Sequence, residues 1–252
     1  MAQLAELVRF CDELLDAKVF QDYCPNGLQI EGATEVNKVV TGVTACQALI
    51  DAAVAADADL LLVHHGFFWK GESPCLTGMK RRRIAGLIEN NISLLAYHLP
   101  LDAHPEYGNN AQLAQRLGLE LEGRFGRDER DQIGMYGRLQ KAMDVQEFAS
   151  HITKVLGRET LHLAGQGDQI ERVAWCTGAA QGYIESTPGL GVQAFISGEV
   201  SEQTTHFVRE SGVHYYAAGH HATERYGVQA LAELLVQRFG IAHDFIDIDN
   251  PV

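Results

Sequence analysis

Short apolar runs alternate along the chain with longer stretches in which apolar residues recur at helical spacing. The first such stretch, residues 1–18, spaces its apolar side chains three or four positions apart, which predicts an amphipathic surface helix. Apolar runs follow at 60–63 and 94–97, and helical stretches separate them. This order of strand, helix and strand predicts an α/β fold with largely parallel sheets.

The pattern occurs twice. Residues 38–66 align without a gap with residues 172–200, at an offset of 134, and residues 93–102 align with residues 215–224, at an offset of 122. Polar positions also match. The duplication predicts two similar lobes, residues 1–125 and 126–252. The most loop-like stretch, 123–134, lies at their junction, and Asp144 is the expected N-cap of the helix that follows it.

Composition narrows the class of protein. The net charge of −13 disfavours a surface for duplex nucleic acid. No apolar stretch reaches the length of a membrane span, and the N-terminus lacks the features of a signal peptide. Five scattered cysteines without a CxxC pair indicate a reduced, cytoplasmic protein without disulfides. The basic run Lys80–Arg83 is expected to be a solvated helix face, with a phosphate-contacting patch as the alternative.

Three clusters of histidine and carboxylate follow the ends of predicted strands. In open α/β sheets, ligands bind beyond the carboxyl ends of the strands, so these clusters are candidates for a functional site. The repeat aligns the second cluster with the third, histidine with histidine and aspartate with glutamate. The residues are His64 and His65, then His98 and Asp102, then His220 and Glu224.

Imidazole and carboxylate ligands together suit zinc, iron, manganese, nickel or cobalt. One histidine and one carboxylate from each half could hold two divalent ions, and a bridging water would then lose its proton near neutral pH. His221 competes with His220, but only His220 reproduces the spacing of His98 and Asp102. Glu199 aligns with His65, so the repeat predicts that it lies near the site, where it or His98 could shuttle protons.

Other histidines and aromatics carry weaker expectations. Phe67, Phe68 and Trp69 are expected in the core or an interface, with a wall or platform for substrate as the alternative. Isolated histidines are usually surface or hydrogen-bonded residues; here these are His104, His151, His162, His206, His214 and His243.

Several motifs together resemble a known family. They include "YCPNGLQIEG", "LLLVHHGFFWKG", "HLPLDAHPEYGNNAQLA", "FISGEVSEQ" and "GHHATERYG". In this order they resemble the YbgI proteins, the short bacterial branch of the family named after the NGG-one-interacting factor three. Its members bear the name type-2 GTP cyclohydrolase I homologue. The resemblance covers nearly the whole chain.

The resemblance implies two similar lobes, a dinuclear metal centre between them, and toroidal hexamers whose metal sites face the central cavity. It implies that Glu224 bridges the two ions and that His98 lies at or just outside the ligand shell. The implied ligands are His64, His65, Asp102, His220 and Glu224.

The leading functional hypothesis is a dinuclear metal-dependent hydrolase that acts on a small, nucleotide-like or amide-containing substrate. The chain has no phosphate-cradling GxxxxGK[ST] loop, so the cyclohydrolase name alone does not define its reaction. Two alternatives remain open: a non-enzymatic metal-binding scaffold, regulator or metal carrier, and an iron-dependent oxidase.

Overall fold

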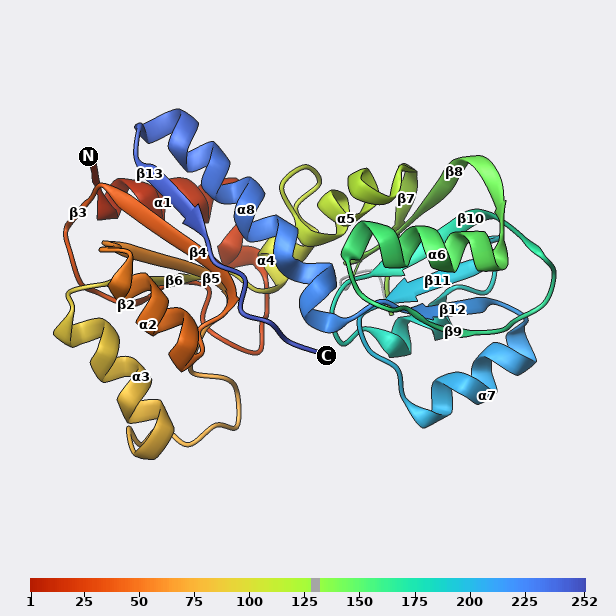
Figure 1. Ribbon diagram of the computed structural model, residues 1–252, viewed down its shortest axis with the longest axis horizontal. Helices are drawn as coiled ribbons and strands as arrows, with labels where there is room; N and C mark the ends of the chain where they lie inside the picture. The colour runs from red at the N-terminus through yellow and green to blue at the C-terminus, as the bar shows by residue number, and fades with distance from the viewer. Residues whose placement is uncertain (128–131) are drawn as a thin grey trace. The chain divides into compact units, whose positions relative to one another are not determined.

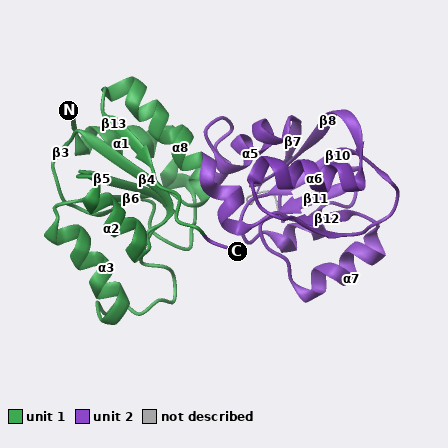
Figure 2. Ribbon diagram, viewed as in Figure 1, with its two compact units in different colours: residues 1–101, 227–249 green, residues 102–226, 250–252 purple. Residues whose placement is uncertain are grey.

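A computed structural model describes residues 1–127 and 132–252. It divides the chain into two compact units (Figure 2). Unit 1 comprises residues 1–101 and 227–249, and unit 2 comprises residues 102–226 and 250–252. These bounds differ from the predicted lobes, 1–125 and 126–252. Two pairings account for the difference. β13 (Ala242–Phe245) pairs in parallel with β4 (Lys38–Thr44), which brings the end of the chain into unit 1, and β7 (Leu119–Phe125) pairs with β8 (Gly134–Asp144), which keeps both sides of the predicted junction in unit 2. Part of the predicted junction, 128–131, lies outside the described residues.

Unit 1 is built on a five-stranded sheet in the order β13-β4-β5-β6-β2. β5 (Leu60–His65) pairs in parallel with β4 and with β6 (Ser93–Ala96), while β2 (Gly27–Ile30) joins the edge antiparallel to β6. A separate two-stranded antiparallel pair joins β1 (Ala2–Gln3) to β3 (Glu35–Val36). The sheet is therefore largely parallel, and β5 lies at its centre.

Helices cover both faces of this sheet (Figure 1). Side chains alternate along β5: Leu60 and Leu62 pack with α1 (Leu4–Leu14) and the later part of α8 (His220–Phe239). Leu61 and Val63 pack on the other face, with α2 (Gln47–Ala55) and α3 (Gly78–Glu89). Burial on both faces explains why the strand is a continuous apolar run rather than an alternating one.

Unit 2 contains a six-stranded mixed sheet in the order β7-β8-β10-β11-β12-β9. Its centre is parallel, and its outer pairs are antiparallel. The parallel part contains β10 (Gln169–Cys176), β11 (Ala194–Ser197) and β12 (His214–Ala217). The outer strands are β7 (Leu119–Phe125), β8 (Gly134–Asp144) and β9 (Leu161–Leu163).

One face of the unit 2 sheet packs against α5 (Asn109–Leu117) and α6 (Val145–Leu156). Trp175 is fully buried there, and its Nε1 donates to the carbonyl oxygen of Asn110 at 3.0 Å. The Asp144 carboxylate accepts the backbone N–H of Gln146 at 2.8 Å, which confirms the predicted N-cap of α6.

The order of elements is consistent with the duplication, and the α/β class is confirmed. In unit 1, β4, α2, β5, α3 and β6 follow one another. In unit 2, β10, η2 (Gln181–Ser186), β11, α7 (Glu202–Ser211) and β12 take the same order. The counterpart of α2 is only a short 3₁₀ helix, because Pro188 and two glycines with positive φ, Gly189 and Gly191, follow it and cannot extend a helix.

Two further findings concern the class of protein. Within the described residues, no helix is both long enough and apolar enough to span a bilayer. All five cysteines lie in the described part of the chain, and none forms a disulfide.

Candidate metal centre

The first cluster lies at the carboxyl end of β5. His64 and His65 are the last two residues of the strand, which parallel neighbours hold on both sides. His64 is fully buried, whereas His65 is partly exposed. The central strand of a parallel sheet thus ends in two imidazoles, at the edge where α/β sheets bind their ligands.

The three histidines at the strand ends of unit 1 are each held through Nδ1. The Nδ1 atom of His64 donates to the carbonyl oxygen of Tyr97 at 2.9 Å. Thr44 Oγ1 lies 3.0 Å from Nδ1 of His65, and Asp22 Oδ1 lies 2.7 Å from Nδ1 of His98. One ring nitrogen of each histidine lies within 4.8 Å of those of the other two. Bonds at Nδ1 fix the orientation of each ring and favour Nε2 as the ligand atom.

Asp22 organises the turn around His98. Besides the imidazole, its carboxylate accepts the backbone N–H of Leu99 at 2.9 Å and the side-chain amide of Asn26 at 2.8 Å. Burial acts to raise the pKa of Asp22, but the hydrogen bonds from His98, Asn26 and the backbone of Tyr23 outweigh it and lower that pKa below its usual value. The carboxylate is therefore charged and a firm acceptor near neutral pH.

The aromatic run behind the histidine pair serves two purposes. Phe67 is buried in the core with Ile30, as expected of a packing residue. The indole of Trp69 lies edge-on to His98, with ring centroids 5.0 Å apart, and its Nε1 donates to the carbonyl oxygen of Gly66. Trp69 is therefore a wall of the histidine cluster.

In the basic run, Lys80 pairs with Glu72 at 3.1 Å.

The second cluster lies in unit 2, where α8 begins directly after β12. His220 lies between two carboxylates: Nδ1 is 2.7 Å from Glu199 Oε1, and Nε2 is 3.1 Å from Glu224 Oε2. Burial acts to lower the pKa of His220, but Glu224 and then Glu199 outweigh it and raise that pKa to about 9. A metal ion at Nε2 would take the place of this proton, since a ligating imidazole is neutral.

Two buried carboxylates accompany His220. Asp102 and Glu224 are 6% and 2% exposed, and each offers an oxygen within 4.8 Å of the other. Asp102 Oδ1 accepts the side-chain amide of Asn109 at 2.9 Å and the hydroxyl of Thr177 at 3.3 Å. Two like charges this close and this buried repel each other, and a bound cation would compensate them.

Gly178 provides the space that Glu224 occupies. A Cβ at this position would lie 2.1 Å from Glu224 Oε1 and 3.2 Å from His220 Nε2. The backbone has φ +69°, a left-handed conformation that glycine adopts at little cost. Both the space and the conformation therefore require glycine beside the carboxylate.

The donor groups of both units fit divalent metal ions. Unit 1 presents three imidazoles whose orientation is fixed, and unit 2 presents one imidazole and two buried carboxylates. Nitrogen and oxygen donors in this mixture are typical of zinc, iron and manganese sites.

Comparison with known proteins identifies the relatives of the chain. The family model Duf34/NIF3 (NGG1p interacting factor 3) matches residues 2–251. The chain belongs to the Duf34/NIF3 family. A "GTP cyclohydrolase 1 type 2 homolog" of Pseudomonas aeruginosa is 58% identical over 248 residues, 98% of each chain. The homolog of the same name in Escherichia coli K12 is 52% identical over 247 residues, again 98% of each chain.

Two solved structures share the fold of this chain. The structure titled protein ybgI, of unknown function, matches with a TM-score of 0.95 at 50% identity and covers all of both chains. A protein from Thermus thermophilus matches with a TM-score of 0.89 at 36% identity, also over all of both chains.

Outside the two clusters, histidines bond locally. His104 stacks on Tyr107, and His206 pairs with Glu202 in the same helix. The others bond to the Leu117 carbonyl (His151), to each other (His162 and His214) and to Thr41 (His243). His220 is the member of its pair that contacts Glu224, whereas the backbone N–H of His221 donates to Val252.

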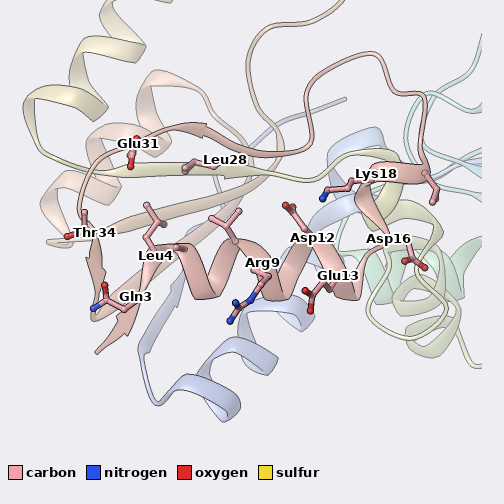
Figure 3. Close-up of a pocket in the computed structure, with 13 residues that line it drawn as sticks. Gln3, Leu4, Arg9, Asp12, Glu13, Asp16, Lys18, Leu28, Glu31 and Thr34 are labelled. Atoms are coloured by element: carbon pink, nitrogen blue, oxygen red, sulfur yellow. The ribbon is translucent and has the colours of Figure 1, made fainter.

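A cavity of about 720 Å³ in unit 1 lies along α1, where Leu4, Arg9 and Asp12 line it with Leu28 of β2 (Figure 3). None of the candidate site residues lines this cavity.

Four residues of the clusters were missed in the sequence. Asp22 lies in no repeated motif, Asn109 lies in one of the family motifs but was given no role, and Thr177 looks like an ordinary turn residue. Gly178 carried a usable signal: at the offset of 134 it aligns with Thr44, which bonds His65. Because Thr44 supports the site in unit 1, the aligned Gly178 was a candidate for a supporting role in unit 2.

Proposed function

We propose that this Duf34/NIF3 protein is a dinuclear metal-dependent hydrolase of a small, nucleotide-like substrate. The proposed ligands are His64, His65, Asp102, His220 and Glu224, with Glu224 bridging the two ions. Bound divalent ions would supply a hydroxide nucleophile at neutral pH and polarise the bond under attack. Zinc, iron, manganese, nickel and cobalt all suit this set.

One observation carries the proposal: four histidines at the strand ends, His64, His65, His98 and His220, are each oriented by a bond at Nδ1. The partners are a carbonyl for His64, a hydroxyl for His65 and carboxylates for His98 and His220. Partners of this kind are the usual support of metal-ligating histidines. A purely structural role would not require the same orientation four times.

We assign different roles to the two remaining groups. Glu199 holds His220 from the side of Nδ1, which makes it a positioning residue. His98 lies beside His64 and His65, and its Nδ1 is bonded to a charged carboxylate. An imidazole of this kind can accept a proton at Nε2, so we assign proton transfer to His98.

The names of the relatives guide the choice of substrates. GTP belongs in any panel, because cyclohydrolase chemistry hydrolyses a purine at its imidazole carbon. Other nucleotides and simple amides extend the panel to substrates that a metal-activated hydroxide also attacks.

The test combines metal analysis with turnover. Protein purified without added metal is analysed for bound ions, then loaded and assayed against the panel. We expect two ions per chain in the wild type, and loss of turnover in Asp102→Ala and Glu224→Ala. Glu210→Ala, which removes an exposed acid from α7, is the matched control and should keep full turnover.

Each other result points elsewhere. Fewer than two ions per chain overturns the dinuclear centre. Two ions without turnover of any substrate overturn the hydrolase and favour a scaffold, regulator or metal carrier. Oxygen consumption that iron supports and zinc does not would indicate an oxidase.

Two further parts of the proposal concern assembly and location. We propose a homohexameric ring, which sedimentation at several concentrations tests through the mass of the particle. We also propose a cytoplasmic location, in keeping with five cysteines that form no disulfide.

A further inference from the structure

A second cavity lies within unit 2, beside the His220 cluster. Its volume is about 710 Å³, within the range of small-molecule sites. We call it the Arg158 cavity. Its walls come from the segment after α6, the ends of β11 and β12, and the last two residues of the chain. Its lining residues are Arg158 to His162, Gly198 to Val200, Ala217, Pro251 and Val252.

The cavity combines an apolar wall with a few polar groups, as ligand sites generally do. Leu161 and Val200 are 51% and 37% exposed, and Ala217 and Pro251 extend this apolar wall. Burial and then His214 lower the pKa of His162, and both nitrogens of its ring are already bonded, Nδ1 to the side chain of Gln146 and Nε2 to His214.

Two donors in the walls have unmet hydrogen-bonding capacity. Thr160 is only 9% exposed, and its hydroxyl makes no hydrogen bond to any described residue. Nη1 of Arg158 is also buried and, among the described residues, has no hydrogen-bond acceptor. Unmet polar groups are costly and uncommon in proteins, so a pair of them in one cavity indicates a ligand that supplies the acceptors.

The guanidinium of Arg158 lies against the start of α8. A Cβ on Gly219, the residue before His220, would lie 2.2 Å from Arg158 Nη1, so the guanidinium packs directly on that turn. α8 is 20 residues long, and the N-terminus of a helix favours anions. Two acids also line the cavity: Glu159 is exposed, and the Glu199 carboxylate is bonded to His220. Among the described residues, no ion pair joins Arg158 to either acid, whereas the backbone N–H of His221 in the first turn of α8 already donates to the main-chain oxygen of Val252.

We propose that the Arg158 cavity binds the phosphate group of a phosphorylated small-molecule substrate, with Arg158 and Thr160 as donors. The cavity would hold the phosphate next to Glu199, which positions His220, so the reacting part of the same molecule would lie toward the metal ligands. This inference rests on the proposed function, because it names the substrate class of the same site. An oxyanion needs several donors, and a guanidinium together with a hydroxyl is a common way to supply them.

Calorimetric titration of the full chain, stripped of metal by chelation, tests the proposal separately from the metal centre. The probes are guanosine 5′-monophosphate, guanosine, inorganic phosphate and acetate. We expect the monophosphate to bind at least about tenfold more tightly than the nucleoside, and phosphate to compete where acetate does not.

Variants identify the donors. Arg158→Gln should weaken binding of the monophosphate by about 10- to 100-fold and leave guanosine unchanged. Thr160→Val, which keeps the shape of the side chain and removes the hydroxyl, should weaken binding of the monophosphate less than Arg158→Gln does. Thr160→Ser, which keeps the hydroxyl, should bind the monophosphate as the wild type does. Arg209→Gln removes an exposed arginine from α7 and is the matched control for charge. Thermal melting of each variant checks that it is folded.

Four outcomes would overturn the proposal. These are equal binding of nucleotide and nucleoside, competition by acetate as strong as by phosphate, unchanged binding in both Arg158→Gln and Thr160→Val, and binding that appears only with metal and disappears in Asp102→Ala. The last outcome would place the phosphate on the metal ions and leave the proposed hydrolase intact. Tight binding to the metal-free protein, together with no turnover of any substrate once the protein is loaded with metal, would instead retain the cavity and remove the hydrolase.

Discussion

The two units end their equivalent strands with the same chemistry built from different parts of the chain. After β6 in unit 1, Nδ1 of His98 lies 2.7 Å from Asp22. After β12 in unit 2, Nδ1 of His220 lies 2.7 Å from Glu199. Asp22 comes from a loop near the N-terminus, 76 residues before His98, whereas Glu199 comes from the neighbouring strand end. A carboxylate beside the imidazole is thus common to both units, and its origin in the sequence is not.

The ends of the other strands differ in charge. β5 ends in His64 and His65, whereas the aligned positions after β11 hold Gly198 and Glu199. Thr44, at the end of β4, aligns with Gly178 after β10. Unit 1 therefore offers mainly imidazole nitrogens, and unit 2 offers buried carboxylates. This asymmetry predicts that metal affinity depends most on what keeps the carboxylates of unit 2 in place.

The largest effect is expected from Gly178→Ala. Its Cβ would clash with Glu224 Oε1, and its positive φ would add strain of about 1–3 kcal/mol. We expect loss of at least one bound ion and a lower melting temperature. The aligned change in unit 1, Thr44→Ala, removes one hydrogen bond to His65 and should weaken metal binding by no more than about 10- to 100-fold. For both variants, elemental analysis measures the bound metal and thermal melting measures the stability.

Gly157→Ala is the matched control for strain. Gly157 has φ +72°, close to that of Gly178, but nothing lies within 4 Å of its Cβ position. It should lose stability and keep its metal. If Gly178→Ala also bound two ions with wild-type affinity, the space beside Glu224 would not be needed for metal binding.

The next prediction distinguishes the roles of two carboxylates that bond histidines, Glu199 and Asp22. Glu199→Gln should weaken metal binding by about 10- to 100-fold, because it leaves a proposed ligand, His220, less firmly oriented and less basic. Asp22→Asn acts on His98, which we place outside the ligand set, and should leave metal affinity within about threefold of wild type. Competition with a chromogenic chelator measures both affinities.

Glu202→Gln, at the exposed pair of Glu202 and His206, is a control for loss of a histidine–carboxylate bond as such. A loss of affinity in Asp22→Asn as large as that in Glu199→Gln would make His98 a ligand and remove the distinction drawn between the two units.

The strands, and the site residues that follow them directly, could be predicted from the sequence. The apolar runs locate β5, β6, β11 and β12, and the site residues follow those strands directly, so pattern and topology together bring them to the sheet edges. The repeat also singled out Glu199, which lies 2.7 Å from His220 in the structure. Local periodicity and alignment of the two halves were sufficient for these features.

Other features depend on contacts between distant residues. The loop that carries Asp22 has no periodicity to indicate that its carboxylate reaches His98. The need for glycine at 178 appears only once Glu224 is in place, because a side chain 46 residues later fills the space of the absent Cβ. Unit boundaries likewise depend on the pairing of β13 with β4, which links residues about 200 positions apart. Such contacts leave no local trace in the sequence.

The smallest effect concerns the dependence of stability on pH, and it tests the Asp22 carboxylate alone. The pKa of Asp22 is lowered in the folded chain, so its charge stabilises the fold above the ordinary carboxyl pKa of about 3.9. This contribution is lost as the pH falls through the lower folded value. We expect metal-free wild type to exceed Asp22→Asn by about 1–3 kcal/mol in unfolding free energy at pH 7, since hydrogen bonds to a charged group are lost. The difference should shrink below about pH 4, as urea unfolding at several pH values would measure.

A difference that stayed constant down to about pH 3 would mean that Asp22 acts through its shape and hydrogen bonds, without its charge. The likeness to Glu199 in unit 2 would then be geometric only.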